Sequence, residues 1–179
     1  KLLAIKYGMK EKEANLLKLA STMHDIGKVD IPDRLLKENI IFKKNPEDEN
    51  WKTMKTHAEL GYKMLKDSKK DFLIIAANIA HEHHEKWDGT GYPQGLQGNE
   101  IDIYARITAL ADVYDALASD RPYKKAWDHE EIIKLLEEEK GKQFDPELID
   151  RFFNNIDEIL EIKENYQRKE EELKEKESI

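Results

Sequence analysis

Apolar side chains recur at helical spacing along most of the chain. A spacing of three and four residues places apolar positions on one face of an α-helix. No stretch alternates convincingly between apolar and polar positions, which is the pattern of a half-buried strand. The pattern therefore predicts an all-α fold built as a single helical bundle. The apolar positions that carry this prediction are Leu16, Leu17, Ala20 and Met23, then Trp51, Met54, Ala58, Gly61 and Leu65, then the run from 74 to 80.

Polar residues and glycines mark where the helices are expected to start and end. Helix starts are predicted at Asn45-Pro46, at Asp128 with Glu131 three residues later, and at Asp145-Pro146. Loops are predicted over 27–44 and 88–102, and four of the eight glycines lie between positions 89 and 98. We expect one domain over 1–162 and a charged helical tail over 163–179. Because the first residues already have a helical pattern and no initiator methionine, we expect the chain to be part of a longer protein.

Composition narrows the classes of partner and of metal site. Charged residues make up 38% of the 179 positions, the hydrophobic content is 39% and the net charge is −8, so the basic excess favoured by duplex nucleic acid is missing. The chain has no cysteine, so a metal would have nitrogen and oxygen ligands. The apolar run 73–80 is far shorter than the roughly 20 residues that cross a bilayer. We expect no membrane segment and a cytoplasmic location.

Five of the six histidines lie between positions 24 and 84. The first, His24, continues the apolar stripe of Leu17 and Ala20 at a predicted helix end, so His24 and the adjacent Asp25 can offer a nitrogen and a carboxylate to one point. His57 follows Met54 by three residues and is expected on the core-facing side of its helix. Taken alone, His57 has a second interpretation, as an ordinary hydrogen-bonded core histidine.

Two further motifs add candidate ligands. His83 and His84 are about 100° apart around a helix, so both reach one metal only if the metal lies near the helix end. Asp112 lies in a largely apolar helix, where we expect a buried carboxylate with a partner; a simple hydrogen-bonding role is the alternative. Together the candidates suit two first-row cations. A carboxylate that bridges cations about 3.5–4 Å apart leaves room for a hydroxide that attacks a phosphodiester. The full set is His24, Asp25, His57, His83, His84 and Asp112.

Four motifs resemble those of the HD-GYP family, a branch of the HD-domain metal-dependent phosphohydrolases. They are HDIGK at 24–28, His57 within MKTHAELG, HHEKWDGTGYP at 83–93 and ADVYDALASDRPYKKAW at 111–127. The resemblance runs from roughly residue 16 to 160. It implies a helical bundle of the HD-domain type with a glycine-rich GYP loop and a two-metal centre, with iron as the first expectation and manganese, nickel or zinc as alternatives. It also implies hydrolysis of cyclic di-GMP, or a related cyclic dinucleotide, to pGpG and/or GMP by a metal-bridging hydroxide.

The resemblance also assigns roles to individual residues. The six candidates above become metal ligands, with Asp25 as the bridging carboxylate. Lys28 would contact the scissile phosphate, although an ordinary exposed lysine is the alternative. Tyr92 would contact the substrate, presented by a turn that Gly89 and Gly91 allow, or Tyr92-Pro93 would only anchor the loop. The remaining implied contacts are Asp115 with a guanine edge and Arg121 and Lys124 with the substrate phosphates. His81 has no counterpart among the ligands and is expected beside the ligands or at the surface, and His129, in a predicted first helical turn, is expected to have no role in the site.

The sequence departs from the family pattern in its first part. Family members normally carry an upstream helix with a histidine ligand, and residues 1–23 contain no histidine, so one metal would lack a protein ligand. This favours an alternative function, a weak or inactive signalling module that binds cyclic di-GMP or, through the GYP loop, a diguanylate cyclase domain. A second alternative, an unrelated phosphoester substrate, is disfavoured by the GYP segment with Arg121 and Lys124. Asp102 also replaces a proline that is usual in the family.

Overall fold

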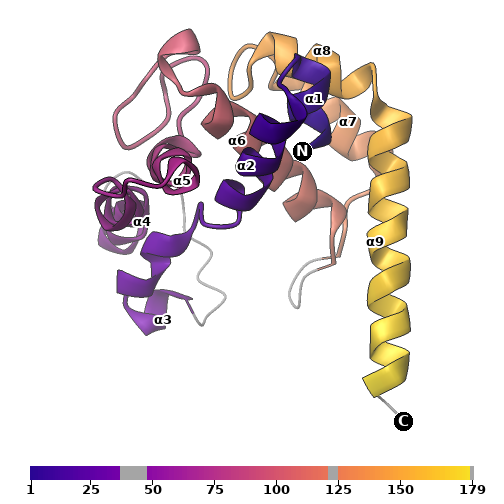
Figure 1. The fold of residues 1–179 in the computed structure, drawn as a ribbon, viewed down its shortest axis with the longest axis horizontal. Coiled ribbons are helices and arrows are strands. Elements are labelled where there is room, and N and C mark those ends of the chain that lie inside the picture. Colours follow the sequence, from indigo (N-terminus) through magenta and orange to yellow (C-terminus); the bar gives the residue numbers. More distant parts are fainter. Residues whose placement is uncertain (37–47, 121–124, 178–179) are drawn as a thin grey trace.

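The computed structural model describes residues 1–36, 48–120 and 125–177. Within these ranges the chain is helical and has no strand, so the predicted all-α fold is confirmed (Figure 1). The elements, with 3-10 helices written η, are α1 (Leu2–Tyr7), α2 (Glu11–Ser21), η1 (Ile26–Asp30), α3 (Asp33–Leu36), α4 (Glu49–Leu65), α5 (Asp71–Glu82), η2 (Gly98–Glu100), α6 (Ile103–Ala118), α7 (His129–Glu138), α8 (Pro146–Phe153) and α9 (Ile156–Glu177).

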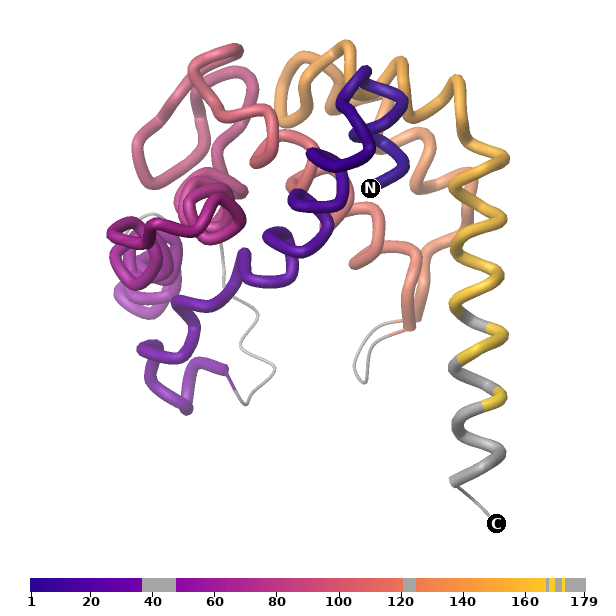
Figure 2. Tube along the Cα trace, viewed as in Figure 1, coloured from indigo at the N-terminus to yellow at the C-terminus, as the bar shows by residue number. Residues whose placement is uncertain are grey.

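The main core is formed where α2, α5 and α6 pack together with α1, α7 and α8. Its largest fully buried side chains include Leu17, Ile79, Leu110, Leu148 and Phe152. These residues come from four different helices, α2, α5, α6 and α8, so burial of their apolar surface is the force that assembles the bundle. In the view of Figure 2, α4 and α5 lie on one side of α2 and α7 and α8 lie on the other.

A second, smaller cluster fixes the segment that follows α2. Ile31, Leu35 and Met54 are buried together, with Trp51 and Leu60 packed against them. The cluster holds η1 and α3 against α4. The prediction of a loop over 27–44 was therefore wrong for residues 27–36, which are the ones that the structure describes. The short helices η1 and α3 form there and bury apolar residues. The second predicted loop, 88–102, is confirmed and contains only the short η2.

Polar caps set two of the helix starts as expected. The Asp145 side chain accepts a hydrogen bond from the Glu147 backbone N–H at 2.8 Å, with Pro146 as the first residue of α8. Glu131 accepts from the Asp128 backbone N–H at the start of α7. Asn45-Pro46 lies outside the described residues. The observed N-cap of α4 is Asp48, whose carboxylate accepts from the Asn50 backbone N–H.

The last helix, α9, runs along one side of the molecule and continues past the other elements (Figure 1). The predicted boundary between residues 162 and 163 falls inside this continuous helix, and the division into a domain and a tail stays a prediction. Among the helices that the structure describes, none is both long enough and apolar enough to cross a membrane.

Candidate metal centre

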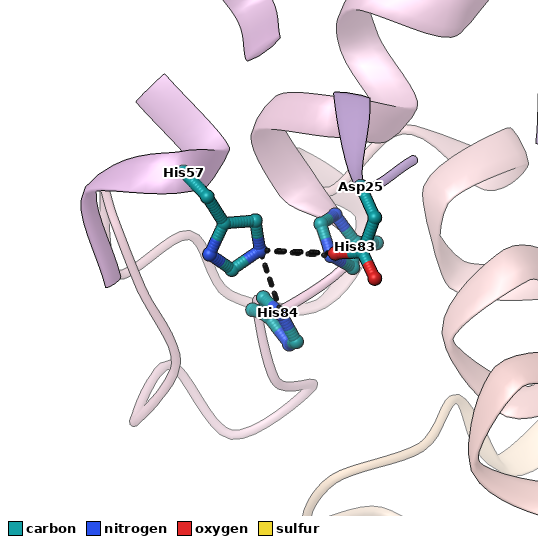
Figure 3. Close-up of side chains that lie close together, drawn as sticks. All are labelled: Asp25, His57, His83 and His84. Carbon is teal, nitrogen blue, oxygen red and sulfur yellow. Dashed lines mark hydrogen bonds and ion pairs between the residues drawn. The ribbon is translucent and has the colours of Figure 1, made fainter. Parts of the chain in front are cut away.

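Five of the six candidate ligands come from three places in the fold, and the sixth, Asp112, lies on α6. His24 and Asp25 lie in the turn between α2 and η1, because α2 already ends at Ser21; the prediction that His24 ends a helix was wrong by one turn. His57 lies in the middle of α4 and is buried. His83 is the C-cap of α5 and His84 follows it, which is the helix-end placement expected for a shared metal. Figure 3 shows the side chains of Asp25, His57, His83 and His84 converging.

A close backbone contact brings these segments together. A Cβ added at Gly27 in η1 would lie 2.0 Å from the His57 carbonyl oxygen and 2.5 Å from the Gly61 nitrogen, both in α4. A Cβ added at Gly61 would lie 3.1 Å from the Ala80 Cβ in α5. The three segments therefore meet through small residues, and only glycine at position 27 permits the observed approach. This contact sets Asp25 beside His57 and His83.

Four potential ligand atoms, one each from Asp25, His57, His83 and His84, lie within 4.8 Å of one another. His57 Nε2 is 3.4 Å from Asp25 Oδ1, 3.4 Å from His83 Nε2 and 3.1 Å from His84 Nε2. Asp25 Oδ1 is buried and has no hydrogen-bond partner in the described part of the chain. A buried carboxylate oxygen without a donor is costly, and a cation between it and the three imidazole nitrogens would remove that cost.

The opposite ring nitrogens fix which histidine atoms face the centre. Nδ1 of His57 lies 2.7 Å from the Met54 carbonyl oxygen, and Nδ1 of His83 lies 3.0 Å from the Ile79 carbonyl oxygen. A carbonyl only accepts, so each Nδ1 must carry the proton. The lone pair of each Nε2 then points to the centre, which is the usual arrangement of metal-binding histidines. His24 follows the same pattern, with Nδ1 at 2.8 Å from a carbonyl oxygen.

The second oxygen of the Asp25 carboxylate faces a different group of side chains. Asp25 Oδ2 accepts a hydrogen bond from Lys28 Nζ and lies 3.4 Å from His24 Nε2. His24 Nε2 lies 3.7 Å from Asp112 Oδ1 on α6. The two oxygens of Asp25 thus face two separate sets of ligand atoms, as a bridging carboxylate requires. Asp112 connects to this second set through His24.

The expectation that Asp112 is buried was wrong. Its side chain is 38% exposed, because this face of α6 opens onto a groove instead of the core. The groove has a volume of about 420 Å³ and runs between α2 and α6. His24 and Asp112 line the groove, and so does Asp115, which is exposed one turn further along α6. The groove is therefore a route by which a solute can approach the Asp112 side of the centre.

Burial keeps two of the histidines neutral. Burial and the neighbouring imidazoles of His83 and His57 lower the pKa of His84 to about 2. Burial likewise lowers the pKa of His57. A neutral imidazole is the form that binds a metal. Both side chains are thus in the metal-binding form at neutral pH.

The pKa of Asp25 moves in the opposite sense from that of a simple buried acid. Burial disfavours the charged form, but the contacts with His24, His83 and Lys28 outweigh burial and hold the pKa of Asp25 well below its usual range. The contact with Asp25 raises the pKa of His24. The Asp25 carboxylate is therefore ionised.

The GYP loop covers one side of the centre. The Tyr92 ring stacks on the His84 ring at a centroid distance of 4.8 Å, and the Tyr92 backbone N–H donates to the His84 carbonyl at 3.2 Å. Gly89 has φ +82°, and a Cβ at Gly91 would lie 2.4 Å from the Lys86 nitrogen, so both glycines are needed for the turn as expected. The Tyr92-Pro93 peptide bond is cis. Trp51 on α4 contacts the Tyr92 ring edge to face.

The model of the HD domain family matches residues 1–148, which is most of the chain. The chain belongs to the HD-domain family. Relatives with phosphodiesterase names confirm the resemblance to its HD-GYP branch. The chain is 44% identical over 162 residues to the 3'3'-cGAMP-specific phosphodiesterase 2 of Vibrio cholerae, covering 90% of this chain and 30% of the relative. It is 41% identical to the cyclic di-GMP phosphodiesterase response regulator RpfG of Xanthomonas campestris, covering 90% and 42%.

Two further comparisons agree with this HD-domain assignment. The chain is 40% identical over 171 residues to a cyclic di-GMP phosphodiesterase of Thermotoga maritima, covering 95% of this chain and 44% of the relative. It shares its fold with the crystal structure of a cyclic GMP-AMP specific phosphodiesterase of V. cholerae, at a TM-score of 0.62 and 18% identity, over 87% of this chain and 41% of the other. The chain spans less than half the length of each of these relatives.

The remaining candidates of this HD domain lie elsewhere or outside the described ranges. His81 pairs with Glu59 at 2.8 Å and stacks on Tyr62, so its ring is engaged away from the four converging ligand atoms. His129 is exposed at the start of α7. Arg121 and Lys124 lie outside the described residues, and their contacts stay predictions.

Glu85, which directly follows His84, is a residue beside the centre that the sequence pattern did not indicate. Glu85 is buried, with 4% of its surface exposed. Its carboxylate accepts hydrogen bonds from the backbone N–H groups of Gln94, Gly95 and Leu96 at 2.7, 3.1 and 3.1 Å. An acidic residue between a helix end and a glycine-rich loop was the available signal, because the free N–H groups of such a loop need an acceptor.

Proposed function

We propose that the protein is a metal-dependent phosphodiesterase that hydrolyses a cyclic dinucleotide, either cyclic di-GMP or a relative such as 3'3'-cGAMP. The observation that carries the proposal is the Asp25 carboxylate, whose buried Oδ1 has no hydrogen-bond donor among the described residues and faces three imidazole nitrogens. The names of the relatives include both substrates, so we propose the substrate class and leave the choice within it to experiment. The product, pGpG or GMP, stays a prediction.

The donor set supports two metal positions. Asp25 Oδ1 with His57, His83 and His84 would hold one ion, and Asp25 Oδ2 with His24 and Asp112 would hold the other. Bound metal ions lower the pKa of water and neutralise phosphate charge, which is the chemistry a phosphodiesterase needs. Iron is our first expectation and manganese, nickel and zinc are alternatives, because imidazole and carboxylate accept all of them.

Lys28 is the catalytic side chain we assign beside the metal ligands. Its ammonium is hydrogen-bonded to Asp25 Oδ2 and its side chain is 40% exposed, so it borders both the centre and the solvent. From this position the ammonium can neutralise charge that develops on a phosphate oxygen and can supply a proton to the departing oxygen.

The substrate would lie against the side of the centre that Tyr92 forms. A tyrosine ring fixed by stacking on His84 presents an edge to a bound nucleotide at little entropic cost. Asp115, at the groove between α2 and α6, is the proposed contact for a guanine edge, and Arg121 and Lys124 are the proposed phosphate contacts. Docking of the GYP loop on a diguanylate cyclase domain and a cytoplasmic location stay predictions.

A binding module without turnover is the second candidate. The observation that favours it is the sparser second half of the centre, where Asp112 is 38% exposed and 3.7 Å from His24 Nε2. A weakly held second ion would leave a protein that binds the nucleotide without cleaving it.

The two candidates are separated by measuring metal content, binding and turnover together. We expect the Mn²⁺- or Fe²⁺-loaded protein to convert cyclic di-GMP or 3'3'-cGAMP to linear products, detected by chromatography. Asp25→Ala and His57→Ala should lose metal and turnover, and His129→Ala, at an exposed site on α7, should keep both. Binding of intact nucleotide by the fully loaded protein would favour the module. Full metal content in both ligand variants would refute the ligand assignment.

A further inference from the structure

Glu85 lies between the metal ligand His84 and the loop that carries Tyr92. Glu85 Oε1 accepts from the backbone N–H groups of Gln94 and Gly95, and Oε2 accepts from that of Leu96. The three donors follow Tyr92 by two, three and four residues. One buried carboxylate thus satisfies three consecutive loop amides.

The same residue also contacts the loop through its backbone. A Cβ at Gly91 would lie 2.5 Å from the Glu85 Cα, so the loop passes against Glu85 just before Tyr92. Just after Tyr92, the loop is bound by the Glu85 carboxylate. Among the described residues, Tyr92 also contacts His84, Trp51 and Lys55. Its N–H donates to the His84 carbonyl and its ring stacks on the His84 ring. Trp51 contacts the ring edge to face, and Lys55 Nζ lies over the ring.

The free-energy cost of burying the Glu85 carboxylate is offset mainly by the backbone N–H groups of the loop. A buried carboxylate needs donors, and charge-assisted bonds from backbone N–H groups are the strong kind. Arg106 lines the same small cavity as Glu85, but its guanidinium is paired with Asp145 at 2.7 Å. The bonds from Gln94, Gly95 and Leu96 are therefore the interactions that Glu85 would lose if the loop moved.

We propose that Glu85 is a positioning residue that holds the Tyr92 ring against His84 and so fixes the substrate-facing side of the metal centre. Its effect on turnover rests on the proposed function, whereas its effect on Tyr92 does not. A role in helix capping alone would leave the Tyr92 ring unaffected by changes at Glu85.

The first test measures the Tyr92 ring directly. In protein labelled with fluorotyrosine, the Tyr92 ¹⁹F resonance is assigned by its loss in Tyr92→Phe. We expect Glu85→Gln to shift this resonance, because the amide group leaves at least one of the three loop N–H groups without an acceptor. Glu85→Asp keeps the charge but withdraws the carboxylate by one methylene, and it should shift the same resonance.

Glu82→Gln is the matched control. Glu82 also lies at the end of α5 and accepts one backbone N–H bond, from Asp102 at 2.6 Å, but this bond ties α5 to the start of α6. We expect this variant to leave the Tyr92 resonance in place. An unchanged Tyr92 resonance in both folded Glu85 variants would overturn the proposal, whether or not the protein hydrolyses a cyclic dinucleotide.

The second test is a double-mutant cycle on cyclic di-GMP turnover with Mn²⁺. We expect Glu85→Gln to raise KM roughly ten-fold with a smaller change in kcat, because loss of a charge-assisted hydrogen bond is of this size and Tyr92 contacts the substrate outside the reacting atoms. In a Tyr92→Ala background the same change should alter KM less than about two-fold. An equal effect of Glu85→Gln in both backgrounds would show that Glu85 acts independently of Tyr92.

Discussion

Replacing Gly27 by alanine tests whether the close contact between η1 and α4 assembles the metal centre. The backbone of Gly27 has no positive φ, so alanine adds no backbone strain and the whole effect comes from one methyl group. That methyl would lie 2.0 Å from the His57 carbonyl oxygen, where ordinary contact begins at 3.4 Å. The two segments must therefore separate by about 1.4 Å, the difference between these two distances.

The separation has a cost in stability and a cost in metal binding. Overpacking of this kind typically costs about 1–3 kcal/mol, and the upper end applies here because the contacted atoms belong to backbone. The same movement carries His57 away from Asp25 Oδ1, which is now 3.4 Å from His57 Nε2. We expect the affinity for Mn²⁺ to fall by about 10–100-fold, the usual effect of disturbing the support of a metal ligand.

Gly61→Ala is the graded comparison at the same contact. Its methyl would lie 3.1 Å from Ala80 Cβ and 3.2 Å from the Gly27 nitrogen, so shifts of a few tenths of an ångström suffice and the loss should stay near 1 kcal/mol or less. Denaturation of the metal-free proteins measures stability and calorimetric titration with Mn²⁺ measures affinity. If Gly27→Ala matched the wild type in both, or lost less than Gly61→Ala, the proposed role of the contact would be refuted.

Three further outcomes follow from the described contacts. Mn²⁺ at a hundred times its dissociation constant should stabilise the protein by about 2.7 kcal/mol. The thermal midpoint should rise, EDTA should reverse the rise, and Asp25→Ala should not show it. Equal midpoints for the loaded and the EDTA-treated protein would contradict metal binding. Lys28→Met should retain Mn²⁺ by titration but lose roughly a hundred-fold or more in kcat, and unchanged kcat would remove Lys28 from catalysis. Arg106→Met should destabilise the protein by about 3–5 kcal/mol in urea denaturation, because it removes the ion-pair partner of Asp145, whose side chain is only 4% exposed. Recovery of stability in the double variant Arg106→Met with Asp145→Asn would support this cause.

Much of the fold could be predicted because its signals are local. The apolar spacing gives the helices, and Asp128 with Glu131 and Asp145 with Pro146 give two of the helix starts, since capping involves residues within one turn. The short helices η1 and α3 were missed because their stability comes from packing Ile31 and Leu35 against α4, a long-range contact that local spacing does not reveal.

The residue types of the candidate site were equally accessible from the sequence. Imidazole and carboxylate in motifs such as HDIGK and HHEKWDGTGYP specify nitrogen and oxygen ligands and a glycine turn, whatever the fold around them. The exposure of Asp112 was not accessible, because it depends on the gap between α2 and α6. Glu85 was missed for a similar reason, since its three donors lie nine to eleven residues later and reach it only through the loop conformation.

The sequence by itself determined the helical fold class, the nitrogen and oxygen character of the candidate ligands and the position of the glycine-rich turn, because each depends on neighbouring residues. The tertiary structure alone decided that the two oxygens of Asp25 face different side chains, with His57 on one side and His24 and Lys28 on the other. That division follows from the approach of Gly27 to α4, which is set by the packing of whole helices and by the absence of a single methyl group.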